Sequence, residues 1–292
     1  MLRTYTLLNV VAHPHPEGTY RSLFERAADR NPVKFRGERY ARISPISSTE
    51  DGVFRGYLAT WMEIDPSSPS IQKSSLKQQS LAEAGIRLPD DIGFNSRLFL
   101  FAFRENGHAL YVETVNEDRQ TLTPSTAKSA FSAILQDAKG DLEDVAVHIA
   151  ARRDAIDYVL GLPSIRKVVI DLNLPNPDDL SEDHRRILEE IEEMNAKRVE
   201  AAVTKKAGAD TLILSERYRV LADLAKDNGS VSAQGRDAEG KRQQRSTKDV
   251  PAKIEEEIEG SDTGYGTIAR VAREGRELSF SGLDDDDNEV LE

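Results

Sequence analysis

Short runs of alternating or continuous hydrophobic residues dominate the first half of the chain, a pattern typical of β-strands. The clearest pair of runs covers residues 98–103 and 108–112, on either side of Asn106-Gly107. An Asn-Gly pair favours a type I′ turn, because both central residues need positive φ. The sequence therefore predicts an antiparallel hairpin closed by a two-residue turn. The apolar stretch at residues 4–12 predicts a strand buried on both faces, as in the middle of a sheet.

Other segments repeat their apolar residues at the helical period. Thr123 followed by Pro124 predicts a helix start, since threonine caps a helix and proline fits its first position. Helices are expected over residues 20–29, 124–137, 154–160, 181–195 and 215–227, with a short acidic helix over 254–258. Further strands are expected over residues 33–35, 39–43, 53–64, 144–150, 165–172 and 198–204, and a polar hairpin joins 230–236 to 241–247. Hairpins interleaved with helices predict an α+β fold with a mainly antiparallel sheet.

Composition divides the chain into three parts. Residues 1–227 predict a mixed α/β body, with a subdivision near 116–123. Residues 228–278 predict a polar region with a basic hairpin and a short helix. Residues 279–292 are acidic and poor in apolar residues, which predicts a disordered tail.

The charge balance and the absent residue types exclude several classes of function. The chain has 292 residues and a formal net charge of −12, so its overall charge does not attract nucleic acid. It contains no cysteine, which excludes disulfides, thiolate metal sites and a cysteine nucleophile. Its apolar runs are too short to cross a membrane, and its first residues do not resemble a secretory signal. We therefore expect a cytoplasmic protein.

Two histidines follow the first predicted strand, in the segment His13-Pro-His15. Alternate residues at a strand end project to one side, so both imidazoles could bind one metal ion. No third ligand stands at a telling spacing. A turn that ends the strand, favoured by the prolines, is the alternative interpretation.

Carboxylates near predicted strand ends are the second candidate site. Asp171, with Glu200 and Lys205, could form the centre of a nuclease or toxin that uses Mg²⁺ or Mn²⁺. The spacing of these residues is common, and ordinary surface charge explains it as well. The chain has no Gly-x-Ser-x-Gly elbow and no glycine-rich phosphate loop. No cofactor is therefore expected.

Positive charge gathers in the polar hairpin near the C-terminal end of the chain. A basic ribbon can bind phosphates, because each contact releases counterions. The hairpin has almost no aromatic residues, which argues against single-strand binding. Pairing of these cations with Asp237, Glu239 and Asp249 is the alternative. The predicted nucleic-acid contacts are Arg236, Lys241, Arg242, Arg245 and Lys248.

Several short motifs carry a resemblance to a known family. They are Asn9-Val-Val-Ala-His13-Pro-His15, Gly18-Thr-Tyr20, Ile165-Arg-Lys-Val-Val-Ile-Asp-Leu-Asn-Leu-Pro-Asn176 and Asn228-Gly229. With them, most of residues 1–255 resembles the bacterial family of domain of unknown function 4747. The resemblance implies a bacterial protein of mobile-element or phage-defence regions. It implies no reaction and transfers no catalytic residue.

These patterns together favour a non-catalytic binding or accessory protein. Its expected partners are another protein and, through the basic hairpin, nucleic acid. A metal-dependent nuclease or toxin is the first alternative, and a structural subunit of a protein complex is the second. The sequence leaves the oligomeric state open.

Overall fold

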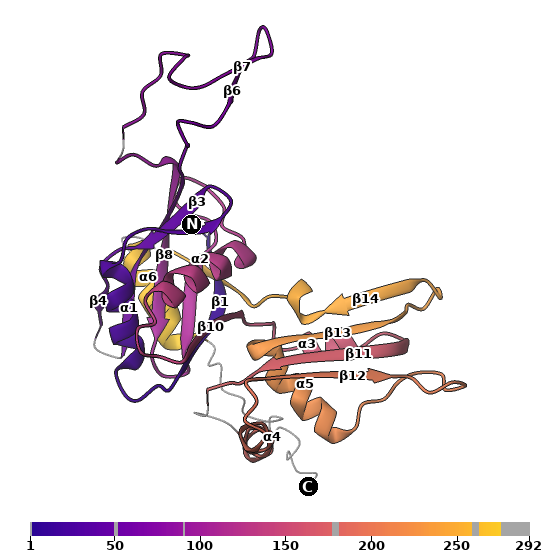
Figure 1. Cartoon of the computed structure of the whole chain (residues 1–292). Helices are drawn as coiled ribbons and strands as arrows, with labels where there is room; N and C mark the ends of the chain where they lie inside the picture. Colours follow the sequence, from indigo (N-terminus) through magenta and orange to yellow (C-terminus); the bar gives the residue numbers. More distant parts are fainter. Residues whose placement is uncertain (1, 50–51, 90, 177–180, 259–262, 276–292) are drawn as a thin grey trace.

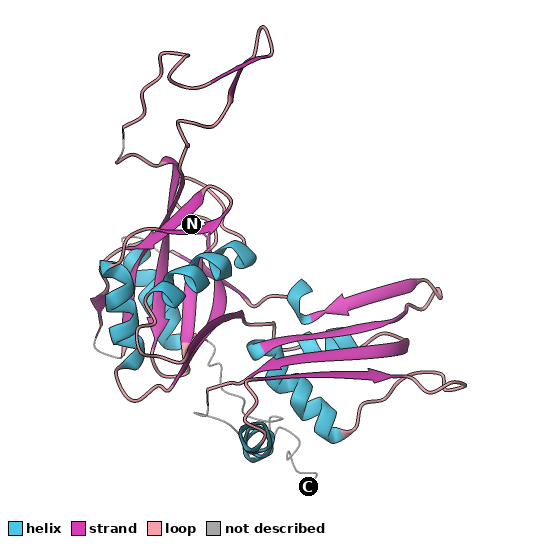
Figure 2. Ribbon diagram, in the orientation of Figure 1, coloured by secondary structure: helices cyan, strands magenta, loops and turns pink. Residues whose placement is uncertain are grey.

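The computed structural model of the chain describes residues 2–49, 52–89, 91–176, 181–258 and 263–275 (Figure 1). These residues form a nine-stranded sheet, a four-stranded sheet and a separate two-stranded ribbon. Helices pack on both sheets (Figure 2). The predicted α+β fold with mainly antiparallel pairing is confirmed.

The nine-stranded sheet is antiparallel throughout, in the order β10-β1-β9-β8-β5-β3-β2, with β15 paired to β1 and β4 paired to β5. Its strands are β1 (Leu2–His13), β2 (Val33–Arg36), β3 (Arg39–Ile43), β4 (Ser47–Ser48), β5 (Val53–Met62), β8 (Phe94–Arg104), β9 (Ala109–Glu113), β10 (Asp144–Ile149) and β15 (Lys253–Glu257). Strand β1 is buried along most of its length, because it pairs with β9, β10 and β15 and is covered on both faces. The predicted central strand is thereby confirmed.

Helices cover both faces of this sheet (Figure 1). On one face, α1 (Thr19–Asp29) and α2 (Pro124–Asp137) pack through Phe24 and Phe131 against Phe101 of β8. On the other face lies α6 (Gly264–Glu274), a helix that is absent from the sequence prediction. The side chain of Thr123 accepts a hydrogen bond from the backbone N–H of Thr126, so the predicted helix start is confirmed.

The four-stranded sheet has helices on a single face within the described residues. Its order is β12-β11-β13-β14. Its strands are β11 (Ser164–Asn173), β12 (Arg198–Thr204), β13 (Gly229–Arg236) and β14 (Arg242–Ser246). The helices that accompany this sheet are α3 (Ala155–Leu160), α4 (Glu182–Glu193), α5 (Glu216–Asn228) and the short helix η1 (Thr247–Asp249). The side chains of Val168, Ile170 and Leu172 are buried beneath the helices. Because neighbouring residues of a strand face opposite sides, Lys167, Val169 and Asp171 lie on the open face.

A long arm extends from the nine-stranded sheet, between β5 and β8 (Figure 1). It carries the short strands β6 (Ser70–Gln72) and β7 (Lys77–Gln79), which pair with each other. Most of its residues are exposed, as the composition of residues 65–80 indicates.

Buried side-chain amides join the two sheets. The Nδ2 of Asn9 donates to the Oδ1 of Asn228 at 2.9 Å and to the carbonyl of Asp227 at 3.3 Å. The Nδ2 of Asn176 donates to the carbonyl of Val10 at 3.1 Å. Asn9, Asn176 and Asn228 all belong to the motifs that carry the family resemblance, so these motifs have a structural role at the junction.

We expect Asn9→Ala to lower the free energy of unfolding by about 1–3 kcal/mol, because it removes the hydrogen bond that Asn9 donates to the buried Oδ1 of Asn228. Urea denaturation measures the change. Asn173→Ala is the matched control, since the Nδ2 of Asn173 donates to the carbonyl of Asn228 from a half-buried position. An unchanged stability for Asn9→Ala would show that the amide does not hold the junction.

The predicted turn at Asn106-Gly107 is wrong, although the hairpin itself is present. Arg104 of β8 pairs with Ala109 of β9, so four residues form the loop. Positive φ angles occur at Gly107 (76°) and His108 (52°) and not at Asn106. The carbonyl of His108 accepts a hydrogen bond from the backbone N–H of Val10 at 3.1 Å, which ties the loop to β1. A contact with a distant strand therefore determines the turn.

The acidic helix predicted over residues 254–258 is also wrong. The segment forms β15, an edge strand paired with the first half of β1. Its residues alternate, with Ile254 and Glu256 half-buried and their neighbours exposed. Ile254 packs on the core beneath α6, and Glu256 pairs with Arg270 of α6. Tertiary pairing overrides the helix propensity of the glutamates.

The predicted domain limits fall at particular points of the fold. Residues 116–123 lie between β9 and α2, which share one core. The limit at residues 227 and 228 falls at the end of α5, before β13 continues the sheet of β11. The predicted tail at residues 279–292 lies outside the described residues. Among the helices that the structure describes, none is long and apolar enough to cross a membrane.

Candidate functional site

The open face of the four-stranded sheet ends in a hollow on the side away from the nine-stranded sheet. Its volume is about 610 Å³. It is lined by Ser164 and Arg166 of β11, by Lys205 just after β12, by Gln234, Gly235 and Arg236 of β13, and by Arg242, Gln243 and Gln244 of β14. Four of these side chains are cationic and none is acidic. We call this site the basic hollow.

An irregularity in β11 gives the basic hollow its shape. The register between β11 and β13 shifts between Ile165 and Lys167, which places Arg166 beside β13. The Nη2 of Arg166 donates to the Oε1 of Gln234 at 3.0 Å. A Cβ on Gly235 would lie 2.1 Å from the carbonyl oxygen of Ser164, so only glycine allows the strands to approach this closely.

The cations of the basic hollow have no acidic partners. Within the described residues, Arg166, Lys205, Arg236 and Arg242 make no ion pair. The guanidinium of Arg236 donates to the carbonyl of Gly240, and the ammonium of Lys205 donates to the carbonyl of Ala209. Carbonyl partners leave the full positive charge in place.

Acidic residues of the hairpin have other hydrogen-bond partners. The carboxylate of Asp237 accepts from the backbone N–H of Lys241 at 2.8 Å and from Gln243 at 3.0 Å. The carboxylate of Asp249 accepts from the backbone N–H of Ser246 at 2.8 Å, as part of a capping box. These two carboxylates thus stabilise a turn and a helix start.

The structure separates the five basic residues predicted to bind nucleic acid. Arg236 and Arg242 line the basic hollow, and Lys241 lies in the adjoining turn. Arg245 points to the helix side, where its Nη1 donates to the carbonyl of Tyr158 at 2.8 Å and its guanidinium lies 4.9 Å from that ring. Lys248 belongs to η1, at the opposite end of β14.

Two members of the basic hollow were not predicted as binding residues. Arg166 lies near the start of a strand whose partners lie far along the chain, and the sequence pattern predicts Lys205 only as a catalytic residue. The sequence signal for both is a cation at a strand end. It becomes informative only once the strand order is known.

The predicted nuclease residues are only partly brought together. Asp171 and Glu200 stand opposite each other on β11 and β12. The Nε of Arg198 lies 2.6 Å from the Oδ1 of Asp171, and its Nη2 lies 3.7 Å from the Oε2 of Glu200. Lys205 lies five residues beyond Glu200, about 16 Å along the strand direction. The two carboxylates therefore share an arginine, with Lys205 at the other end of the sheet.

The predicted histidine pair lies in a cluster of rings. The ring centroids of His13 and His15 are 6.0 Å apart, and His108 lies 5.3 Å from His15 and 4.7 Å from Tyr20. The Nε2 of His13 lies 3.4 Å from the carbonyl of Leu174, and burial lowers the pKa of this imidazole. In the part of the chain that the structure describes, no three histidine, aspartate or glutamate side chains are arranged to hold a metal ion. No sequence pattern singles out His108, because only the loop conformation brings it to β1.

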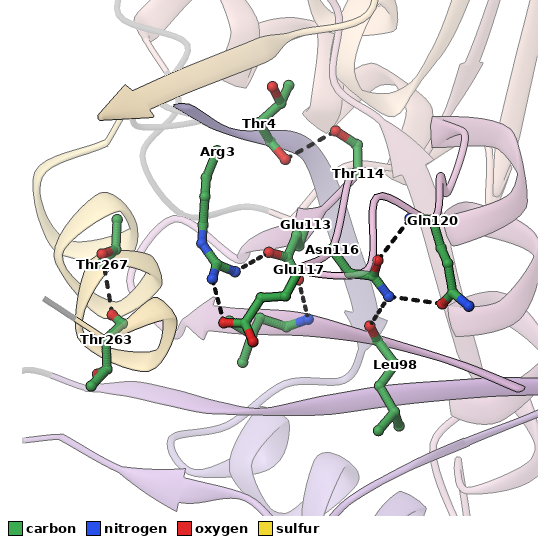
Figure 3. Close-up of polar contacts among 11 residues, drawn as sticks. Arg3, Thr4, Leu98, Glu113, Thr114, Asn116, Glu117, Gln120, Thr263 and Thr267 are labelled. Atoms are coloured by element: carbon green, nitrogen blue, oxygen red, sulfur yellow. Dashed lines mark hydrogen bonds and ion pairs between the residues drawn. The ribbon is translucent and has the colours of Figure 1, made fainter. Parts of the chain in front are cut away.

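A second polar cluster is buried between β1, β9 and α6 (Figure 3). Arg3 pairs with Glu113, and its Nη2 donates to Glu117 at 2.6 Å. The backbone N–H of Leu100 donates to the Oε2 of Glu113 at 3.1 Å. The side chains of Arg3 and Glu113 are only 6% and 2% exposed. Their contacts join strands of one sheet, which indicates a structural role.

Comparison with known proteins places the chain in a family. None of the curated proteins matches it. The family profile described as Domain of unknown function (DUF4747) matches residues 3–273, which confirms the resemblance carried by the short motifs. The match runs from the start of β1 almost to the end of α6 and covers most of the 292 residues, so the chain belongs to the DUF4747 family.

Proposed function

We propose that this protein binds nucleic acid, without catalysing a reaction on it, through the basic hollow. The observation that carries this proposal is the set of four cations, Arg166, Lys205, Arg236 and Arg242, that converge without acidic partners. Arginine and lysine bind phosphate oxygens, and each such contact gains from counterion release. The net charge of −12 does not oppose this binding strongly, because charges more than about 10 Å away are screened at 0.1 M salt.

The chemistry of the lining favours a phosphate backbone over an acidic protein. Besides the cations, the basic hollow contains only glutamine, serine and glycine. The glutamine amides and the serine hydroxyl can donate hydrogen bonds to phosphate and sugar oxygens. Protein interfaces usually have an apolar or aromatic centre, which this lining lacks. It also lacks the histidine and carboxylate side chains that most often transfer protons, which supports a binding role.

The proposal extends to the biological setting implied by the family resemblance. A nucleic-acid-binding accessory protein suits a bacterial mobile element or a phage-defence region. This setting rests on the resemblance alone.

We expect Arg236→Ala/Arg242→Ala to weaken binding to a duplex DNA by about tenfold at moderate salt, because two side chains that bind phosphate are removed. Fluorescence anisotropy of a labelled duplex measures the affinity. The matched control is Arg186→Ala/Arg217→Ala, which removes the same charge from α4 and α5 on the helix side of the same sheet. The control should bind as tightly as the wild type.

Two outcomes would contradict the proposal. An unchanged affinity for Arg236→Ala/Arg242→Ala would show that the basic hollow is not the site, and an equal loss in the control would show that only overall charge matters. Incubation of the duplex with Mg²⁺ or Mn²⁺ completes the test. Cleavage that Asp171→Ala abolishes would replace the binding role by a nuclease.

A further inference from the structure

The face of the nine-stranded sheet on which α6 lies is only partly covered. At the first turn of the helix, the ring centroid of Tyr265 lies 5.1 Å from that of Tyr57 on β5. The helix runs from there towards Arg104, at the other end of β8. In the opposite direction the same face continues through Ala59, which stands opposite Leu98 of β8. Leu98 is 55% exposed, and Tyr57 is also exposed. We call the apolar surface formed by Tyr57, Ala59 and Leu98 the bare face.

The long arm between β5 and β8, residues 63–93, also exposes large apolar side chains. In the part of the arm that the structure describes, no residue is buried. A single exposed apolar residue is ordinary, but several on one arm without a core of its own indicate a surface that binds a partner. The exposed members are Ile64, Ile71, Leu76, Ile86 and Ile92.

Hydrogen bonds within the tip of the arm give it a fixed shape. The backbone N–H of Leu76 donates to the carbonyl of Gln72 at 2.8 Å, and the hydroxyl of Ser75 donates to the Oε1 of Gln72 at 2.7 Å. Leu76 has a φ of 54°, a left-handed conformation that leucine rarely adopts. Its side chain is 73% exposed. The turn therefore presents an apolar side chain at the end of the arm, away from the rest of the chain (Figure 1).

An acidic cluster adjoins the bare face. Arg3 is shared between Glu113 and Glu117, so these three side chains together carry one net negative charge (Figure 3). The side chain of Glu117 is 76% exposed. The cluster lies beside Leu98, because the side-chain amide of Asn116 donates to the carbonyl of Leu98 at 2.9 Å. The bare face thus has an acidic side chain at its rim.

The arm carries the complementary charge. Residues 66–82 contain Lys73 and Lys77 and no acidic residue, although the whole chain has a net charge of −12. An apolar arm with lysines at its tip therefore matches an apolar face with a glutamate at its rim.

The position of the arm root favours a second copy of the chain as the partner. The arm rejoins the sheet at Phe94, which is four residues before Leu98, or about 13 Å along β8. A two-fold axis close to the two arm roots would therefore lay each arm across the bare face of the other copy. In such a symmetric dimer the same contact forms twice. One side of a standard protein interface contributes about 20–30 residues, which an arm over residues 63–93 supplies.

We propose that two copies of this chain form a symmetric dimer by exchanging their arms. Ile71 and Leu76 of each arm pack on the bare face of the other copy, and Lys73 or Lys77 pairs there with Glu117. The dimer does not depend on the proposed function, because the arm and the bare face lie outside the basic hollow.

Disulfide crosslinking tests the contact directly, since the chain has no cysteine of its own. The single variants Leu76→Cys and Leu98→Cys are mixed, one of them with a tag that changes its mass, and are oxidised mildly without nucleic acid. We expect a disulfide between a tagged and an untagged chain. The matched control mixes Leu76→Cys with Met194→Cys, which places the second thiol at an exposed apolar position outside the bare face and should give little crosslinking.

Analytical ultracentrifugation measures the dissociation constant of the dimer. We expect Leu76→Ser to raise it by about a hundredfold, because burial of one leucine side chain contributes about tenfold or more and the substitution is present twice in the dimer. Ile213→Ser removes an exposed apolar side chain outside both surfaces, so this control should leave the dissociation constant unchanged.

Three outcomes would overturn the exchange of arms. The first is a wild-type chain that stays monomeric at every concentration up to about 0.1 mM, where interfaces of standard size associate. The second is a disulfide that forms within a monomer of Leu76→Cys/Leu98→Cys, because the arm then folds onto its own bare face. The third is a dimer that Leu76→Ser leaves unchanged, because its interface then lies elsewhere.

Discussion

Replacing Arg3 with methionine is expected to lower the free energy of unfolding by about 3–5 kcal/mol, because the carboxylate of Glu113 is then buried without its countercharge. Burial already raises the pKa of Glu113, while the Leu100 N–H and Arg3 lower it. The other partner of Arg3, the exposed Glu117, is itself an anion and supplies no countercharge to Glu113. Urea denaturation at neutral pH measures the effect.

A double variant separates the charge from the loss of packing. Arg3→Met/Glu113→Gln should recover much of the stability, since the amide oxygen of glutamine can still accept the hydrogen bond from Leu100. Arg21→Ala breaks an exposed pair with Glu25 and should cost less than about 1 kcal/mol. If Arg3→Met costs no more than Arg21→Ala, the buried pair contributes nothing to stability.

The second large effect is a loss of stability in acid that depends on His148. Burial lowers the pKa of this imidazole from 6.5 to about 4 in the folded protein. The unfolded chain therefore takes up a proton as the pH falls below 6.5, before the folded protein does. This uptake removes roughly 3 kcal/mol from the free energy of unfolding between pH 6.5 and pH 4. The contribution of the neutral His148 is therefore fully present above pH 6.5 and is lost as the pH falls towards 4.

Urea denaturation across this pH range, without nucleic acid, measures the loss. The wild type and His148→Gln are compared, because glutamine does not titrate. Carboxylates contribute equally to both proteins, so the difference between the two curves isolates His148. Parallel curves would mean that the imidazole is not held neutral by burial.

Local sequence patterns predicted the elements whose signal is contained in a short stretch of sequence. The start of α2 follows from Thr123 and Pro124, and the burial of β1 follows from its continuous apolar run. The hairpin of β13 and β14 follows from two polar runs around a turn at residues 237–240. In each case the predictive signal lies within a short stretch of sequence, although the strands that bury β1 are distant along the chain.

Contacts between distant segments could not be predicted in this way. The glutamates of β15 favour a helix, yet the segment pairs with β1 some 250 residues earlier. The conformation of His108 depends on a hydrogen bond from Val10. The basic hollow likewise combines β11, β13 and β14 with the residue that follows β12, and its cations converge only once these strands are in register.

The salt dependence of duplex binding tests the central claim most directly. The logarithm of the affinity is measured against the logarithm of the salt concentration, for the wild type and for a variant with alanine at Arg166, Lys205, Arg236 and Arg242. If these four cations bind phosphates, the slope should become shallower by about three to four, at about 0.9 for each phosphate that the variant no longer neutralises. Identical slopes would contradict the assignment of nucleic-acid binding to the basic hollow.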